Sequence, residues 1–353
     1  MNLDADPATR ASDRKAEIAA FKRIVATYEK PNAKRASWQL FNSLGSYVAL
    51  WVGMYFALKV SWWLVIPLAL LAAGIIVRVF IIFHDCGHGS FFKSERANNF
   101  WGFICGMFTM VSYGHWRWEH SRHHATSGDL DRRGIGDIWT LTVQEYLESS
   151  RWKKFAYRLA RNPFILFVIA PLFLFFVRER FPIPEAKKKE RRAVYTMNAV
   201  LLLNAIVLSL IFGFVPYLII QLIITGVSGA AGIWLFYVQH QFEGVYWERR
   251  ENWSYMKAAL EGSSFYKLPK VLQWFSGNIG FHHIHHLSPK IPNYNLEECH
   301  HSDPMFHEIE PLTFLNSLKS LKFRLWDERN RNLVGYSYLR KVRAKQNSEQ
   351  AAA

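Results

Sequence analysis

Residues 62–88 read WWLVIPLALLAAGIIVRVFIIFHDCGH, an apolar stretch that ends in two histidines four residues apart. The apolar part, Trp62–Phe83, is long enough to cross the hydrocarbon core of a bilayer as one helix. His84 and His88 follow at once, and a spacing of four places both imidazoles on one helix face. The stretch therefore predicts a membrane span that presents a pair of histidines at one membrane surface.

Three other apolar stretches have a similar length, at Gln39–Leu58, Val194–Phe214 and Tyr217–Tyr237. The short connections at Lys59–Ser61 and Val215–Pro216 predict two tight antiparallel hairpins. Trp101–Tyr113 and Pro163–Val177 are apolar but short, so we expect them to lie along the membrane or to be buried. If Pro163–Val177 crossed instead, the loops after it would change sides. The sequence thus predicts an all-α, multi-pass integral membrane protein with four transmembrane helices in two hairpins and a cytoplasmic helical cap.

The chain has 353 residues, half of them hydrophobic, and a net charge of +15. Lys and Arg gather in residues 1–37 and 84–193, whereas the two predicted hairpin turns contain only Lys59. Because cytoplasmic loops carry the excess of positive charge, we expect both termini and the middle segment on the cytoplasmic side of the cell (inner) membrane. No nucleic-acid-binding motif accompanies the charge, so nucleic acid is not an expected partner.

This pattern divides the chain into four parts. They are a cytoplasmic N-terminal segment (1–37), a membrane domain (38–300) with a cytoplasmic loop at 84–193, a cytoplasmic C-terminal region (301–340), and a polar tail (341–353) expected to be disordered. The first 37 residues lack the apolar core of a signal peptide. None of the three cysteines belongs to a CxxC pair, so no thiolate zinc site is expected. Disulfides are not expected either, because the protein faces the cytoplasm.

Clustered histidines carry the functional signal. The clusters are HDCGH with His84 and His88, HSRHH with His120, His123 and His124, and HHIHH with His282, His285 and His286. A single histidine, His240, follows the last span, and the predicted topology brings all of them to one membrane face. These imidazoles are too many for one zinc ion, which takes about four ligands, so their number favours a dinuclear site. Imidazole suits iron, copper, nickel and zinc, and the spacing alone does not choose among these metals.

The remaining histidines are interpreted without a ligand role. His283 leaves the helix face shared by its neighbours and is expected to be structural. Interfacial polar positions are assigned to His115, His300, His301 and His307. Three acidic residues are candidates for accepting the free ring N–H groups of the ligands and so orienting them: Asp85, Asp129 and Asp137.

With these three clusters, in this order and separated by paired apolar spans, the chain resembles the membrane fatty acid desaturase family from its first hairpin to about residue 300. The three residues between His84 and His88 resemble the methyl-end (Δ12/ω6-type) branch, and a histidine rather than glutamine at 282 differs from the front-end branch. The stretch NIGFHHIHHLSPKIPNYNL (Asn278–Leu296) is similar to bacterial methyl-end enzymes. The chain differs from the acyl-CoA desaturases of this family at position 236, where it has Phe236 and they have an asparagine.

The resemblance implies two Fe²⁺ ions held by the eight box histidines with His240 as a ninth ligand, and O₂ and external electrons as co-substrates. It implies an oxidoreductase (EC 1.14.19-type) that introduces a cis double bond into a lipid acyl chain. No cytochrome b5 or reductase segment is visible, so a separate ferredoxin or cytochrome b5-like donor is expected. A hydroxylase, epoxygenase, acetylenase or carotenoid oxygenase would share these boxes. The non-enzyme alternative, a histidine-rich metal transporter, would favour ligands inside the spans.

Overall fold

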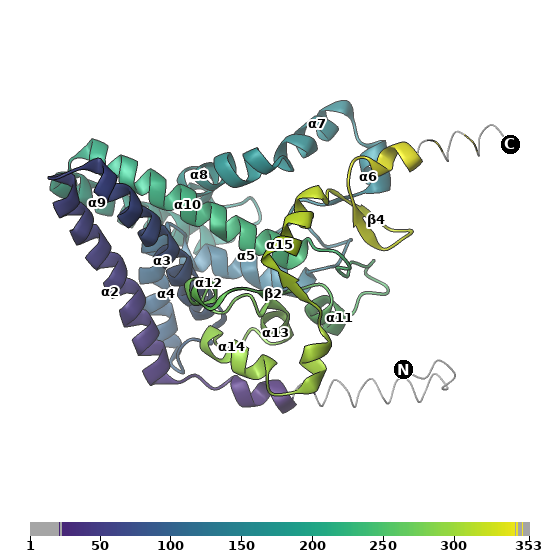
Figure 1. The fold of residues 1–353 in the computed structure, drawn as a ribbon, viewed down its shortest axis with the longest axis horizontal. Coiled ribbons are helices and arrows are strands. Elements are labelled where there is room, and N and C mark those ends of the chain that lie inside the picture. Colours follow the sequence, from purple (N-terminus) through teal and green to yellow (C-terminus); the bar gives the residue numbers. More distant parts are fainter. Residues whose placement is uncertain (1–20, 22, 343, 345–347, 349–353) are drawn as a thin grey trace.

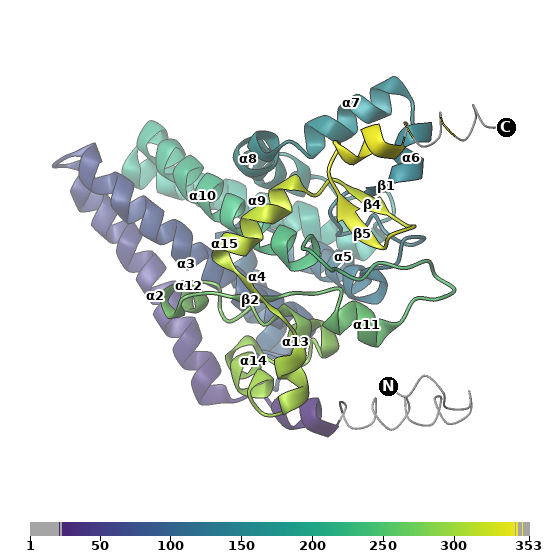
Figure 2. The same ribbon diagram turned by 45° about the vertical axis from the view of Figure 1, so that its right-hand side comes forward.

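The computed structural model describes residues 21, 23–342, 344 and 348. Two pairs of long helices dominate it: α2 (Ala33–Leu58) with α3 (Trp62–His88), and α9 (Lys188–Phe212) with α10 (Phe214–His240). The long helices extend toward one end of the molecule, and most of the shorter helices and the strands gather at the other (Figure 1; Figure 2). The helix α3 packs against both α2 and α10. It also contacts several of the shorter helices.

Within the described residues, three helices are long and apolar enough to cross a membrane: α3, α9 and α10. The predicted first span forms α2, which is comparably long but is not among these three helices. The polar residues Asn42, Ser43 and Ser46 lower its mean hydropathy. The predicted stretch at 163–177 falls largely in the second helix of a bent pair. The pair consists of Arg151–Ala160 and Ile165–Arg180, and the bend between the two helices is 59°. By length and composition this pair is either a broken span or a re-entrant segment.

The turn of the second hairpin differs from the prediction. The first turn lies at residues 59–61 as expected, but the second lies at Gly213 rather than at Val215–Pro216. Gly213 has a φ of 82°, a left-handed conformation that costs glycine little. Pro216 instead lies in the first turn of α10. Backbone N–H groups in a first turn have no acceptor within the helix, so the missing N–H of proline costs no hydrogen bond there.

The prediction of an all-α fold was incomplete, because the structure contains two small sheets. In one, β1 (Leu141–Thr142) pairs parallel to β4 (Leu325–Asp327), which pairs antiparallel to β5 (Asn332–Val334). In the other, β2 (Phe265–Lys267) and β3 (Pro311–Thr313) run parallel. Strands of two or three residues are too short to show an alternating pattern in the sequence. The first residues of the predicted disordered tail, Lys341 and Val342, are helical, and most of that tail lies outside the described residues.

The remaining elements are short. They are α4 (Glu95–Thr109), α5 (Tyr113–Thr126), α6 (Val143–Glu148), α7 (Arg151–Ala160), a π-helix (Ile165–Ile169), α8 (Ala170–Phe176), α11 (Tyr255–Leu260), α12 (Lys270–Phe275), α13 (His282–Leu287), α14 (Asn293–His300), α15 (Phe314–Ser317), and 3₁₀-helices at Arg178–Arg180, Pro304–Glu308 and Leu318–Lys322. All three histidine boxes lie on helices, as predicted: at the end of α3, in α5 and in α13.

Burial distinguishes α3 from α9. The last three turns of α3 are buried almost all round, from Ile75 to Gly87, as expected of a helix at the centre of a bundle. Only Val194 and Met197 of α9 are buried, and its exposed side chains include Leu202, Leu203 and Leu210. An apolar surface of this kind would be unfavourable in water and suits contact with lipid.

Candidate metal site

Nine histidines converge at the C-terminal ends of α3 and α10. Within each of two groups, one nitrogen from every ring lies within 4.8 Å of those of the others. The first group contains His84, His88, His120, His124 and His285, and the second contains His123, His240, His282 and His286. The groups adjoin, since the rings of His124 and His286 stack with centroids 4.3 Å apart. The structure thus brings together all nine histidines that the sequence singled out as ligand candidates.

The distances within the groups suit shared metal ions. The Nε2 atom of His240 lies 3.2 Å from Nε2 of His123 and 3.0 Å from Nε2 of His282. In the first group, Nε2 of His124 lies 2.9 Å from Nε2 of His285 and 3.1 Å from Nε2 of His120. Two imidazole nitrogens bound to one ion at about 2.1 Å and roughly at right angles would be about 3.0 Å apart.

Two buried nitrogens give independent support for metal binding. Nε2 of His88 and Nε2 of His286 are shielded from solvent and have no hydrogen-bond partner within the described part of the chain. Buried polar atoms are rarely left without a partner, and an ion is one of the partners that explains such an exception. One of these nitrogens belongs to each group, so the donor set fits one ion in each.

Outer hydrogen bonds orient three of the rings. Nδ1 of His84 lies 3.0 Å from Oδ1 of Asp85, and Nδ1 of His123 lies 2.7 Å from Oδ1 of Asp137. Nδ1 of His240 lies 3.2 Å from the carbonyl oxygen of Gly262. With Nδ1–H donated to these oxygens, each ring presents its Nε2 lone pair to the centre of the site.

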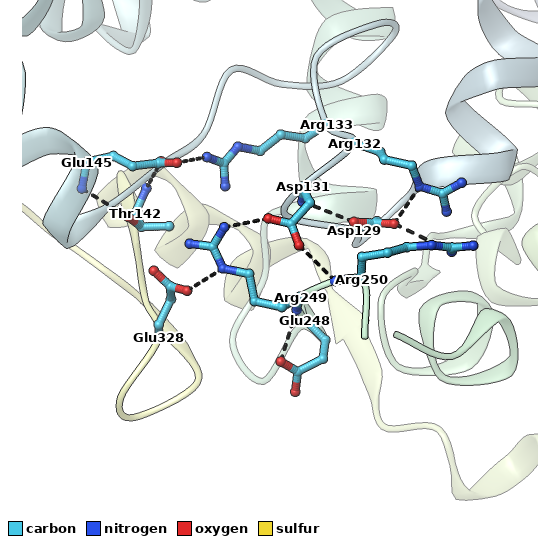
Figure 3. A network of polar contacts seen from close by, with 10 residues as sticks. All are labelled: Asp129, Asp131, Arg132, Arg133, Thr142, Glu145, Glu248, Arg249, Arg250 and Glu328. Atoms are coloured by element: carbon cyan, nitrogen blue, oxygen red, sulfur yellow. Dashed lines mark hydrogen bonds and ion pairs between the residues drawn. The ribbon is translucent and has the colours of Figure 1, made fainter. Parts of the chain in front are cut away.

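Asp129, the third predicted orienting residue, is engaged elsewhere. Its carboxylate pairs with Arg132 at 2.7 Å and with Arg250 at 3.7 Å (Figure 3). The neighbouring Asp131 pairs with Arg249, which also bonds Glu328. This network connects the loop after α5 to the loop after α10, so it holds the two polypeptide segments that carry the second box and His240 together.

The remaining histidines lie outside the two groups. His115 pairs through Nδ1 with Glu119 at 3.2 Å and accepts the backbone N–H of Ile183 at its Nε2. Nε2 of His283 lies 3.1 Å from Nδ1 of His300, on the other side of α13 from its neighbours. His300 itself forms a third group with His301 and His307. The sequence interpretation treated these three as separate interfacial residues and missed their proximity.

Burial sets the charge of the site. It lowers the pKa of five box histidines well below the ordinary value of 6.5, and neighbouring histidines lower it further: His120, His124, His282, His285 and His286. These rings are therefore neutral at pH 7. A neutral imidazole has the free lone pair that metal binding requires.

Aromatic side chains and one glycine complete the surroundings of the histidines. Trp116 stacks on His120 with ring centroids 4.3 Å apart, and Phe236 lies 5.1 Å from His123 and 5.2 Å from His240. Gly136 has a φ of 76°, and a Cβ there would come within 3.1 Å of Cβ of His123. The sequence offered no signal for Trp116 or Gly136, because both depend on contacts between separate segments.

A cavity of about 860 Å³ reaches the first group of histidines. Its lining includes His88 and His120, the least buried box histidines of the first group. The lining combines apolar, basic and acidic side chains: Phe103, Trp116 and Met197 are apolar, Arg117, Lys189 and Arg192 are basic, and Glu95 and Glu190 are acidic. A second cavity of about 710 Å³ lies among α2, α4, α9 and α10, and none of the nine histidines lines it.

Comparison with known proteins adds to this geometry. Residues 61–312 match the family model described as fatty acid desaturase. A fatty acid desaturase of Bacillus subtilis is 49% identical over 318 residues, which cover 90% of each chain. An sn-1 oleoyl-lipid 12-desaturase of Picosynechococcus is 28% identical, over 72% of this chain and 74% of the relative. An sn-1 acyl-lipid omega-3 desaturase (ferredoxin) of Synechocystis is 26% identical, over 73% of each chain.

Proposed function

Because this chain belongs to the fatty acid desaturase family, we propose that it introduces a cis double bond into the acyl chain of a membrane lipid at a diiron centre. The observation that carries this proposal is the convergence of nine histidines in two adjacent groups at the ends of two apolar helices. Iron is the metal proposed because imidazole binds it well and because the desaturases of this family generally use a diiron centre.

The ligands in this proposal are the nine histidines, five toward one ion and four toward the other. When bound, the iron pair with O₂ and two external electrons supplies the oxidising power that removes hydrogen from two adjacent methylene carbons. Asp85 and Asp137 hold the rings of His84 and His123 in the orientation that presents Nε2. Trp116 and Phe236 cover the imidazoles with apolar surface and so exclude water from their neighbourhood.

The cavity beside His88 and His120 is the proposed path of the acyl chain. Its volume lies within the range of about 300–1,000 Å³ that ligand pockets occupy. Phe103 and Trp116 offer apolar contacts for methylene groups within a lining that is otherwise largely polar, and the exposed cations Lys189 and Arg192 suit the phosphate of a glycerolipid head group. A chain held in this way has one short segment next to the histidines, which fixes the carbons that react.

Further details of the proposal rest on the resemblance and on the relatives. We propose four spans, with α2 and both termini arranged so that the histidines face the cytoplasm beneath the cell membrane. The double bond is proposed at the Δ12 position, in line with the 12-desaturase named among the relatives, although the name of the Bacillus subtilis relative gives no position. The electron donor is proposed to be a ferredoxin or a cytochrome b5-like protein, and one relative carries ferredoxin in its name.

Expression in a bacterial host that lacks polyunsaturated fatty acids tests this function. Gas chromatography with mass spectrometry of the membrane lipids should reveal a new alkene, and derivatised products report its position. The His123→Ala variant provides the inactive control. A hydroxylated or epoxidised lipid without a new alkene would contradict desaturation, and an alkene at another carbon would contradict only the Δ12 assignment.

A further inference from the structure

Three histidines outside the diiron ligand set form a separate cluster. His300 ends α14, His301 follows it, and His307 lies on the 3₁₀-helix Pro304–Glu308. One nitrogen of each ring lies within 4.8 Å of those of the other two. The ring centroids are 5.0 Å apart for His300–His301, 5.4 Å for His300–His307 and 5.8 Å for His301–His307. His300 is buried, whereas His301 and His307 are exposed, so the cluster opens to solvent.

Buried residues separate this cluster from the nine histidines. The ring of Phe281 lies 5.1 Å from that of His300, and Phe265 lies 4.4 Å from it. His283, which lies on α13 with the third histidine box, contacts His300 through its Nε2 and belongs to neither group of the nine histidines. An ion bound at His300, His301 and His307 would therefore be distinct from the iron pair.

The backbone that carries the cluster is fixed in place. The N–H of His301 bonds the carbonyl oxygen of Glu297, which closes the end of α14. The side chain of Asp303 caps the 3₁₀-helix by accepting the N–H of Met305, and fully buried Phe306 anchors that helix in the core. Little of the segment would have to be ordered on binding, so the entropic cost of binding a ligand is small.

The hydrogen bond between His283 and His300 completes the arrangement. It engages Nδ1 of His300, so a metal ion bound by this ring would be held through Nε2. Ligand histidines commonly have such an outer partner on the second ring nitrogen, which fixes both tautomer and ring orientation. Here that partner is itself a buried imidazole.

We propose that His300, His301 and His307 form a mononuclear site for a divalent transition-metal ion of the zinc class. Three imidazoles with one open position for water match a tetrahedral zinc ion. Calcium and magnesium do not fit, because they prefer oxygen ligands and the three donors here are nitrogens. The site does not depend on the proposed desaturation, and it lies close to the third histidine box, since His283 is the neighbour of His282 in α13.

Metal stoichiometry of the purified, iron-loaded protein in detergent tests this site. Titration with Co²⁺ should show one further equivalent beyond the two irons, with the visible absorption of a tetrahedral ion. In the double variant His301→Ala/His307→Ala that equivalent should be lost, or its affinity lowered at least tenfold, with two irons retained. Glu308→Ala, an exposed substitution in the same segment, is the matched control and should retain cobalt binding.

Two outcomes would overturn the proposal. One is the absence of any saturable cobalt binding beyond the iron pair in the unmodified protein. The other is an unchanged third equivalent in His301→Ala/His307→Ala, which would assign the cobalt to other residues. The His123→Ala variant separates the two sites, because it should lose iron from the pair and still show the tetrahedral Co²⁺ equivalent that disappears when His301→Ala/His307→Ala is added, whatever cobalt enters the vacated box histidines. If cells that express the protein showed no desaturation, the expected number of Co²⁺ ions bound per protein would stay the same.

Discussion

Asp85 accepts two hydrogen bonds from Asn293, one from its backbone N–H at 2.6 Å and one from its side-chain amide at 2.8 Å. The other oxygen of Asp85 pairs with His84, so one buried carboxylate joins the first histidine box to the segment that follows the third. Asn293 also accepts a hydrogen bond from Gln39 of α2. A single polar path thus runs from α2 to the candidate metal site.

Removal of Asn293 should therefore loosen the first box. Asn293→Ala takes away the amide donor to a buried carboxylate, and such bonds to charged groups contribute about 1.5–3 kcal/mol. We expect a lower thermal unfolding midpoint and a lower iron content in the purified protein. Asn295→Ala is the control, because Asn295 bonds the carbonyl oxygens of Tyr28 and Lys30 and not Asp85. Equal loss of iron in both variants would argue against the path.

The two acidic residues Asp137 and Asp129 should differ in their effect on metal binding. Asp137→Asn weakens the partner of His123 and should lower iron affinity by roughly 10- to 100-fold, as outer partners of ligand histidines generally do. Asp129→Asn affects a carboxylate that pairs with arginines, so iron content should be retained even if stability falls. Iron analysis of both purified variants checks this, and a reversed order would refute the assignment.

Loss of a single proposed ligand should abolish the reaction. His123→Ala and His285→Ala each remove a nitrogen from one of the two groups, so we expect no product in lipid profiles and an unchanged amount of protein in the membrane. Arg122→Ala changes the exposed residue beside His123 and should retain activity. Full activity of either histidine variant would contradict the proposed ligand set.

Narrowing the cavity should reduce turnover without loss of iron. Thr196 is exposed and lines the cavity beside His88 and His120, so Thr196→Trp places a bulky ring in the proposed path of the acyl chain. We expect at least tenfold less product with two irons retained. Tyr195→Trp changes the adjacent exposed residue, which does not line the cavity, and should leave product formation unchanged. Comparable activity of the two variants would direct the acyl chain to another route.

The network around Asp131 predicts a dependence on pH. Hydrogen bonds from the backbone of Arg250 and the side chain of Arg249 lower the pKa of Asp131 below its ordinary value of 3.8. A lowered pKa means that the ionised carboxylate favours the folded loop at neutral pH, and that this contribution is lost as the pH falls below 3.8. Asp131→Asn should therefore raise hydrogen exchange in residues 247–253 at pH 7, and the difference from the unmodified protein should shrink in acid.

Local patterns predicted the histidine boxes well, because the spacing of residues on one helix is enough to place His84 with His88, or His120 with His124. His240 was found from its position just after a span. The division into groups of five and four was not predictable, since it depends on how α5 and α13 approach the ends of α3 and α10. The same limit explains why Asp129 and Asp137 were not distinguished: each lies in the same loop, and only the fold decides which one meets a histidine.

Nine imidazole rings gathered in two adjoining groups have a consequence for the folding of the protein in the cell. Without cations, the lone pairs of their ring nitrogens repel one another, and burial denies them water, so the site itself opposes closure of the segments around it. Binding of metal removes this repulsion and joins helices that are distant along the chain. With iron as the proposed metal, the abundance of folded protein should therefore follow the supply of iron during synthesis, with iron-starved cells degrading chains that never closed.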